Sequence, residues 1–173
     1  MTEDKPIVNR VAKSRTLTVD FEEILNQYDL VDLDIAPWLW QGLVLKEKDF
    51  RESLENHNWS DYAGKDVCVY CSEDAIIPTW AYMLVATYIE EAKAQAHFGK
   101  IDDVVSTILI NHINNFDTEE FTDKRVIIKG CGRWELSPEV YMTTTQKLQP
   151  LVKMLMFGEP CSTVPVYRKK RGN

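Results

Sequence analysis

Short apolar runs bounded by polar residues or glycines mark four strands in this chain. Leu30 to Ile35 alternates apolar and acidic side chains, the pattern of a strand with one buried face. Runs at 67–71, 96–98 and 126–129 predict three further strands, and the last of them leads into Gly130-Cys131-Gly132. The segments between these strands are too long for hairpins, which connect strands through a few residues.

Apolar residues at helical spacing fill the segments between the strands. The spacing predicts helices at 21–26, 46–57, 78–94, 103–116 and 138–149. Ser137 and Pro138 mark the start of the last of these, as N-cap and first helical residue, and Pro150 marks its end. The stretch 38–45 is apolar on both faces, so its periodicity does not distinguish strand from helix.

Three segments carry more specific expectations. The helix from Pro78 is apolar on opposite sides, which predicts that it is buried all round and that Trp80 is buried with it. Pro150 is expected to begin another helix over 151–157, with Gly158 as its C-terminal cap. The segment 159–167 contains two prolines, which excludes a central strand and predicts an extended segment or an edge strand.

This alternation of strands and helices predicts an α/β fold, with one mainly parallel sheet of about four to five strands covered by helices. We expect the four predicted strands to share that sheet. The length of 173 residues suits a single domain over 1–173. A flexible N-terminal arm of about residues 1–15 and a basic tail at 168–173 flank it.

The charge and the hydropathy of the chain exclude some classes of binding partner. A formal net charge of -7 opposes non-specific binding to nucleic acid, which requires a basic face. The tail Arg168-Lys169-Lys170-Arg171 is able to attract an anionic surface, although such a run is more often a solvated terminus. The sequence has neither a signal-peptide pattern nor a run long enough to span a membrane, so we expect a cytoplasmic protein without a membrane partner.

Cysteines are the candidate chemistry, because thiols stay reduced in the cytoplasm and serve as ligands, nucleophiles or core residues. Cys71 and Cys131 each follow a predicted strand, so in one parallel sheet both would lie at its carboxyl edge, where such folds bind ligands. Cys161 lies between Pro160 and Pro165 and is expected to join them. Three thiolates suit zinc or iron.

A few other side chains are candidates for metal ligands, redox partners or core residues. Glu159, Asp74 and His57 are the additional ligand types near the expected metal site, and none is strongly indicated. Cys68 and Cys71 have the spacing of a redox or zinc pair, but residues three positions apart on a strand point to opposite faces, so the spacing is weak evidence for such a pair. His112 is expected to be a hydrogen-bonded core histidine.

Two alternatives to a metal site remain open. Cys131 could act as a nucleophile, since Lys129 and Arg133 are nearby cations that would lower the pKa of its thiol. All four cysteines could equally serve only as packing residues in an interaction protein, because reduced cysteine is among the most buried residue types.

Five stretches carry a family resemblance, and they extend over nearly the whole chain. These stretches are 7–12, 41–51, 71–82, 128–131 and 158–165. Together they resemble the bacterial "domain of unknown function 2480" family. In that pattern Cys71, Cys131 and Cys161 occupy motif positions, whereas Cys68 stands where an aliphatic residue or alanine is expected. The stretch 132–136 departs from the family's shorter polar turn, which leaves any role for Arg133 or Trp134 in doubt.

The resemblance also implies a link with iron–sulfur metabolism. The leading hypothesis is therefore an accessory protein of iron–sulfur or metal-cofactor metabolism, with zinc or iron at Cys71, Cys131 and Cys161. A protein partner in cofactor assembly, or an oligomer, would accompany that role. The rival hypotheses are a thiol-dependent transferase or hydrolase with Cys131 as nucleophile, and an interaction protein with structural cysteines.

Overall fold

The computed structural model describes residues 16–130 and 132–170. The predicted arm at 1–15, Cys131, and residues 171–173 lie outside the described residues. The helices are α1 (Phe21–Leu25), α2 (Glu47–Asn56), α3 (Thr79–Glu91), α4 (Ile101–Asn115) and α5 (Pro138–Leu148). The strands are β1 (Thr16–Val19), β2 (Leu30–Asp34), β3 (Asp66–Tyr70), β4 (Gln95–Phe98), β5 (Arg125–Ile128), β6 (Met154–Glu159) and β7 (Ser162–Arg168).

The chain divides into two compact units. The first, called here the terminal unit, contains residues 16–21, 110–130, 132–133 and 138–170 of the described chain. The second, the central unit, contains residues 22–109 and 134–137. Each unit has its own sheet, and the single-domain organisation expected from the length stays a prediction.

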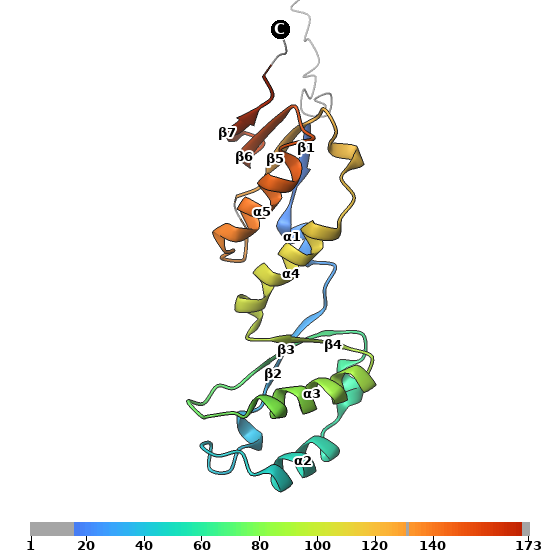
Figure 1. Ribbon diagram of the computed structural model, residues 1–173, viewed down its shortest axis with the longest axis vertical. Helices are drawn as coiled ribbons and strands as arrows, with labels where there is room; N and C mark the ends of the chain where they lie inside the picture. The colour runs from blue at the N-terminus through green and yellow to red at the C-terminus, as the bar shows by residue number, and fades with distance from the viewer. Residues whose placement is uncertain (1–15, 131, 171–173) are drawn as a thin grey trace, which may run out of the picture. The chain divides into compact units, whose positions relative to one another are not determined.

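The sheet of the terminal unit has the strand order β1-β5-β6-β7 (Figure 1). β5 pairs in parallel with both β1 and β6, and β7 returns antiparallel to β6. Helix α5 buries one stripe of side chains at Val140, Thr144 and Leu148. The α/β class and the mainly parallel sheet with helices against it are thereby confirmed.

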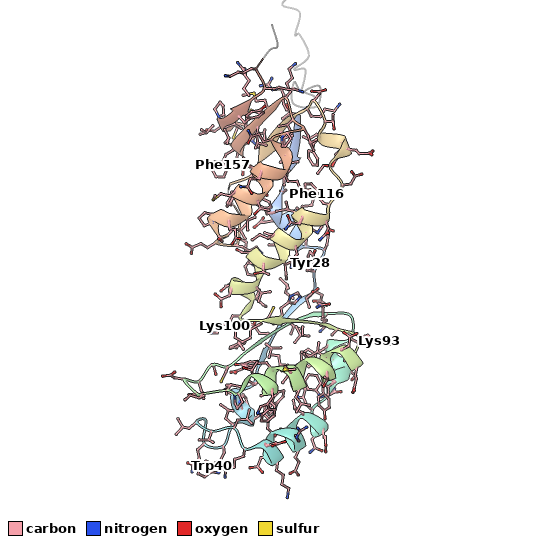
Figure 2. All side chains as sticks on the ribbon, viewed as in Figure 1. Tyr28, Trp40, Lys93, Lys100, Phe116 and Phe157 are labelled. Atoms are coloured by element: carbon pink, nitrogen blue, oxygen red, sulfur yellow. The ribbon has the colours of Figure 1, made fainter. Side chains whose placement is uncertain are left out.

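Aromatic contacts show which face of this sheet α5 covers. Phe157 on β6, labelled in Figure 2, lies 5.6 Å from Tyr141 of α5, measured between ring centroids. Tyr141 in turn lies 5.3 Å from Phe21. Because side chains alternate along a strand, Phe157 and Leu155 face α5, whereas Met154 and Met156 face the opposite side.

The sheet of the central unit has three parallel strands in the order β2-β3-β4. Helices α2 and α3 pack against one face, and their buried side chains form a core with those of the strands. That core contains Leu33, Ile35, Phe50, Leu54, Val67, Val69, Ala81, Val85, Ile89 and Ala94. The other face carries polar or ionisable side chains, which include Asp32, Asp34, Asp66, Cys68 and His97.

Asp34 closes the carboxyl edge of the central sheet. Its Oδ1 atom accepts hydrogen bonds from the backbone N–H of Ala36 at 2.9 Å and from that of Ser72 at 3.0 Å. Burial alone would raise the pKa of Asp34, but these hydrogen bonds, the Ser72 hydroxyl and Lys100 outweigh it and lower that pKa. The carboxylate therefore ties the loop after β3 to the end of β2.

Most of the predicted elements are confirmed. The strands β2, β3, β4 and β5 and the helices α1, α2, α4 and α5 form at the expected positions, with bounds shifted by a few residues. β7 is an edge strand that contains Pro165, as the two prolines predicted. No helix in the described part of the chain is long and apolar enough to cross a membrane.

The prediction that the four strands share one sheet is wrong. β2, β3 and β4 pair with one another, while β5 belongs to the sheet of the terminal unit. The physical reason is β1, whose four residues lie in a stretch that the sequence pattern did not distinguish from an arm. β1 and β6 occupy both edges of β5, so no edge is left for β4.

The helix predicted over 151–157 is also wrong, because residues 154–159 form strand β6. Met154, Leu155 and Met156 are all buried, although successive side chains of a strand point to opposite faces of the sheet. A strand that is buried on both faces shows a continuous apolar run and cannot be distinguished from a buried helix by periodicity. Gly158, with φ +124°, serves the turn into β7 instead of a helix end.

Helix α3 is less buried than predicted. Ala81, Val85 and Ile89 are fully buried, but Met83 is 66% exposed and Trp80 is half-buried. The expectation of a helix buried all round is therefore wrong: α3 lies on one face of a three-stranded sheet and presents its other side to solvent. Trp80 still packs against the core and lies 6.2 Å from Phe50, measured between ring centroids.

The apolar stretch at 38–45 forms a tight turn. Trp40 and Val44 make an isolated antiparallel bridge, and Gln41 and Gly42 between them have φ angles of +54° and +68°. Trp40 is 46% exposed (Figure 2), and the Nζ atom of Lys46 lies 3.7 Å from its ring centroid. A cation over the ring covers part of the apolar surface that the turn exposes.

We expect Gly158→Ala to lower the free energy of unfolding by about 2 kcal/mol or more, measured by urea denaturation. The φ angle at this position strains any residue with a Cβ, at a cost of order 1–3 kcal/mol, and the new Cβ would overlap the carbonyl oxygen of Ser162. Gly64→Ala is the control, since Gly64 also has a positive φ but has no atom within 4 Å of its Cβ position. Equal losses in the two variants would contradict the role assigned to Gly158.

Asp34 predicts a pH dependence of stability. Its folded pKa is below the unfolded value, so its stabilisation is complete above the ordinary pKa of about 3.9 and disappears as pH falls through the folded pKa. Between pH 5 and pH 3, Asp34→Asn should therefore lose stability less steeply than the wild type in urea denaturation. Asp74→Asn at the same edge is the matched control, and a pH profile of Asp34→Asn like that of the wild type would refute this account.

Candidate functional site

A pocket in the terminal unit is lined almost entirely by cations. Its volume is about 460 Å³, within the range of small-molecule sites. The lining residues, which define what we call the basic pocket, are Arg125, Lys153, Met154, Arg168, Lys169 and Lys170. Five of these six side chains are cationic, and they belong to a chain whose net charge is -7.

Strand register brings the two arginines together. Met154 is the partner of Arg125 on one side and of Arg168 on the other, so the three residues form one row across β5, β6 and β7. Neighbouring strands lie about 4.8 Å apart, which places the backbones of the two arginines roughly 10 Å from each other. By strand alternation this row is on the sheet face opposite the one that α5 covers.

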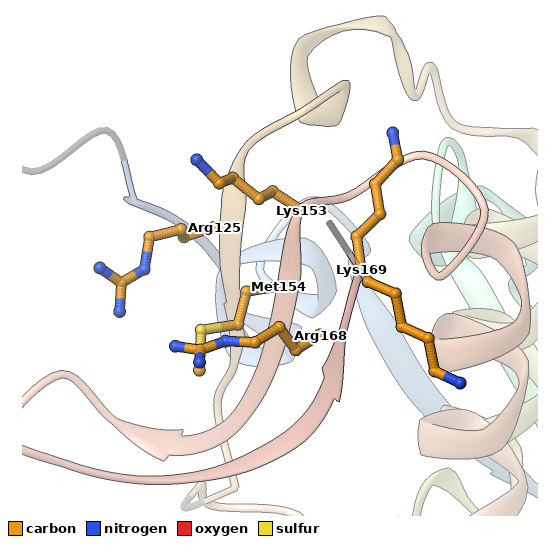
Figure 3. A pocket seen from close by; sticks show the side chains of 6 residues that line it. Arg125, Lys153, Met154, Arg168 and Lys169 are labelled. Atoms are coloured by element: carbon orange, nitrogen blue, oxygen red, sulfur yellow. The ribbon is translucent and has the colours of Figure 1, made fainter. Parts of the chain in front are cut away.

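The lysines join the row through the ends of the strands. Lys153 directly precedes β6, and Lys169 and Lys170 directly follow β7. The backbone N–H of Lys169 donates to the carbonyl of Lys153 at 3.0 Å, which continues the pairing of β6 and β7 by one step. Figure 3 shows Arg125, Lys153 and Arg168 extending toward one side, whereas Lys169 extends toward the other.

The lining cations have little to neutralise them. Within the described residues, the one ion pair formed by a lining side chain joins Lys169 Nζ to Asp123 Oδ1 at 3.0 Å. Both side chains of this pair are more than half exposed, and exposed pairs of this kind contribute about 0–1 kcal/mol. An anion in the pocket would therefore meet cations that are available to bind it.

Sequence reasoning found only part of this pocket. The basic run from Arg168 was recognised as able to attract an anionic surface, but Arg125 and Lys153 are isolated cations that carry no signal of their own. Only the pairing of β5 with β6, and of β6 with β7, brings them beside that run. The pocket also lies at the amino ends of the parallel strands β5 and β6, whereas we expected a ligand at the carboxyl ends of the strands predicted at 67–71 and 126–129.

The cysteines proposed as metal ligands are distributed differently from the expectation. Cys71 follows β3 in the central unit and is half-buried, and Cys161 lies in the turn between β6 and β7 of the terminal unit and is exposed. Cys131 lies outside the described residues. The argument that Cys71 and Cys131 share one sheet edge is wrong, because β3 and β5 belong to different sheets.

No cluster of metal-ligating side chains is found in the part of the chain that the structure describes. Among the other ligand types considered, Glu159 lies in β6 and Asp74 in the loop after β3. His57 is packed among aromatic rings, 5.1 Å from Trp38 and 4.8 Å from Trp59 between ring centroids, and burial lowers its pKa. The three-cysteine metal site stays a prediction.

Cys68 behaves as a core residue. It is fully buried in the middle of β3, between Asp32 on β2 and His97 on β4. Burial, and then the nearby Asp32 and Asp66 carboxylates, raise the pKa of its thiol to about 11. A thiol with such a pKa stays protonated at neutral pH, which opposes any nucleophilic or ligand role.

Of the two cations proposed to lower the pKa of Cys131, Lys129 forms an ion pair and Arg133 is exposed. Lys129 donates a hydrogen bond from Nζ to Asp20 Oδ2 at 2.6 Å, with both side chains partly buried. This carboxylate offsets the charge of Lys129, so Lys129 lowers the pKa of a nearby thiol less than an unpaired lysine would.

His112, which we expected in the core, is half-buried. Its ring stacks near that of Phe116, with a distance of 6.4 Å between ring centroids.

Comparison with known proteins identifies a family and nothing further. A family model described as "Protein of unknown function (DUF2480)" matches residues 5–169. This confirms the family predicted from the five sequence stretches. No curated protein matches the chain. No solved structure matches it either.

The metal hypothesis predicts retention of zinc or iron after anaerobic purification, measured by elemental analysis. Replacing Cys71, Cys131 or Cys161 by serine should then abolish that retention, because each thiolate would be a ligand. Cys68→Ala is the control and should retain the metal, since Cys68 is enclosed in the core of β3. A metal-free wild-type protein, or equal metal content in all four variants, would exclude the three-cysteine site.

Proposed function

Since the chain belongs to the DUF2480 family, whose function is unknown, we propose a function from its own geometry: the basic pocket binds an anionic ligand. The observation that carries this proposal is that five cationic side chains, and no acidic one among the described residues, line a single pocket. We also retain the cytoplasmic location expected from the sequence as part of the proposal.

Electrostatics support an anion at this position. Like charges held close together repel, and the strand pairing that fixes the row of Arg125, Met154 and Arg168 prevents the arginines from moving apart along the backbone. A bound anion replaces this repulsion by attraction to each cation. The free energy of anion binding therefore includes the removal of the electrostatic repulsion among the cations of the empty pocket.

The two kinds of cation have different roles. Guanidinium groups present several N–H donors in one plane, which suits two-point recognition of phosphate or carboxylate oxygens. Arg125 and Arg168 approach from strands on either side of β6 and can hold one anion between them. The lysines add compact charges at the rim, and Lys169 can leave its exposed pair with Asp123 at little cost.

The lining favours binding over turnover. Its described side chains include no carboxylate, imidazole, hydroxyl or thiol that could act as a general base or nucleophile. The side chain between the arginines is the thioether of Met154, which is 9% exposed and contributes an apolar floor. We therefore propose a binding function for this pocket.

The proposal is tested by fluorescence titration with pyranine, a compact dye that carries three sulfonate groups. The wild-type protein should bind it, and Arg168→Gln should weaken binding by about ten- to hundredfold, since a hydrogen bond to a charged group contributes about 1.5–3 kcal/mol. Arg125→Gln should have a similar effect. Each affinity should fall as salt is added.

Lys48→Gln provides the matched control. It removes one positive charge, as Arg168→Gln does, but Lys48 lies on the exposed surface of α2 in the central unit. The Lys48→Gln variant should bind pyranine with the same affinity as the wild-type protein. If Lys48→Gln and Arg168→Gln weakened binding equally, the dye would be responding to net charge, and the proposed site would be rejected.

A further inference from the structure

We infer that the ligand of the basic pocket is a compact chain of linked phosphates, such as a tripolyphosphate or the triphosphate of a nucleotide. This inference rests on the proposed anion site and specifies its ligand class. It is drawn from three properties of the pocket: the number of its cations, the distance over which they are spread, and the charge of the rest of the chain.

The number of cations exceeds what one phosphate neutralises. A single phosphate group carries a charge of about -1.5 to -2 at neutral pH. The described lining presents five positive charges, and the exposed Asp123 carboxylate offsets only part of one of them, so a lone phosphate would leave about two to three charges repelling one another. Linked phosphates bring further negative charge into the same volume and neutralise the set.

The cations are also spread over the pocket and do not gather at one point. Arg125 and Arg168 stand on strands separated by β6, roughly 10 Å apart at the backbone, and Lys153, Lys169 and Lys170 continue from the strand ends. A chain of phosphates can contact donors spread over such a distance, whereas one tetrahedral anion contacts only those that converge on its own oxygens. The geometry therefore favours an extended anion over a point-like one.

The rest of the chain limits the length of the ligand. With the five lining cations set aside, 15 Lys and Arg remain against 27 Asp and Glu, a net charge of -12. A nucleic-acid strand that continues beyond the pocket would be exposed to the field of this acidic chain, since its charges repeat along its whole length. A ligand contained within about 460 Å³ avoids that cost.

The inference is tested by calorimetric titration of the full chain, in metal-free buffer at physiological ionic strength. The four probes are inorganic phosphate, inorganic tripolyphosphate, ATP and an oligothymidine of about 20 nucleotides. Tripolyphosphate should bind at least about tenfold more tightly than phosphate and more tightly than the oligonucleotide. Equal affinity for tripolyphosphate and ATP would identify the phosphates as the whole determinant, and tighter binding of ATP would add contacts to the nucleoside, for which Met154 offers an apolar surface.

Variants and the four probes together distinguish failure of the linked-phosphate ligand from failure of the anion site itself. Arg125→Gln and Arg168→Gln should each reduce the preference for tripolyphosphate over phosphate, while Lys48→Gln should retain it. If phosphate bound as tightly as tripolyphosphate, the inference would be overturned although the anion site would stand. If the oligonucleotide bound most tightly, the ligand would be nucleic acid, and if neither pyranine nor any of the four probes bound, the anion site itself would be rejected.

Discussion

The antiparallel pairing of β6 and β7 is the constraint on which the basic pocket depends. The turn that contains Gly158 reverses the chain, and six pairs of partners then carry the basic end of β7 back to the start of β6. Met154 becomes the partner of Arg168 there, while its other side already faces Arg125. Backbone hydrogen bonds thus offset the mutual repulsion of cations that a free tail would keep apart.

A basic pocket in an acidic chain is a basis for discrimination. The chain as a whole carries a net negative charge, so long polyanions gain attraction only over the few positions that reach the pocket. Specificity in such a case comes as much from the repulsive surroundings as from the attractive lining. The same surroundings limit non-specific binding, because the net charge of -7 acts on any anion that approaches from another direction.

The fold could be predicted from the sequence where one face of an element is buried. β2 has alternating side chains and α2 has its buried Phe50 and Leu54 one turn apart, and both were located within a few residues. β6 could not be identified, because Met154, Leu155 and Met156 are buried on both faces and show no period. β1 is only four residues long, and its pairing with β5 depends on a partner 109 positions away.

The candidate site was less predictable than the fold. Cysteines attracted attention because their chemistry is visible in a sequence, yet Cys68 is a packed core residue and Cys71 and Cys161 belong to different units. Arg125 and Lys153 resemble ordinary surface cations when read alone. Strand register places them in the lining of the pocket, and a local sequence pattern does not determine that register.

The strand order of the terminal sheet also imposes an order of events on a growing chain. β1 is synthesised early, but its partner β5 follows only after the central sheet β2-β3-β4 has been made, and β5 then needs β6 to cover its other edge. The central sheet lies within the continuous stretch 22–109 and can pair its strands as they emerge. On the ribosome, β1 therefore cannot enter its sheet until β5 and β6 have been made, long after β1 itself was synthesised.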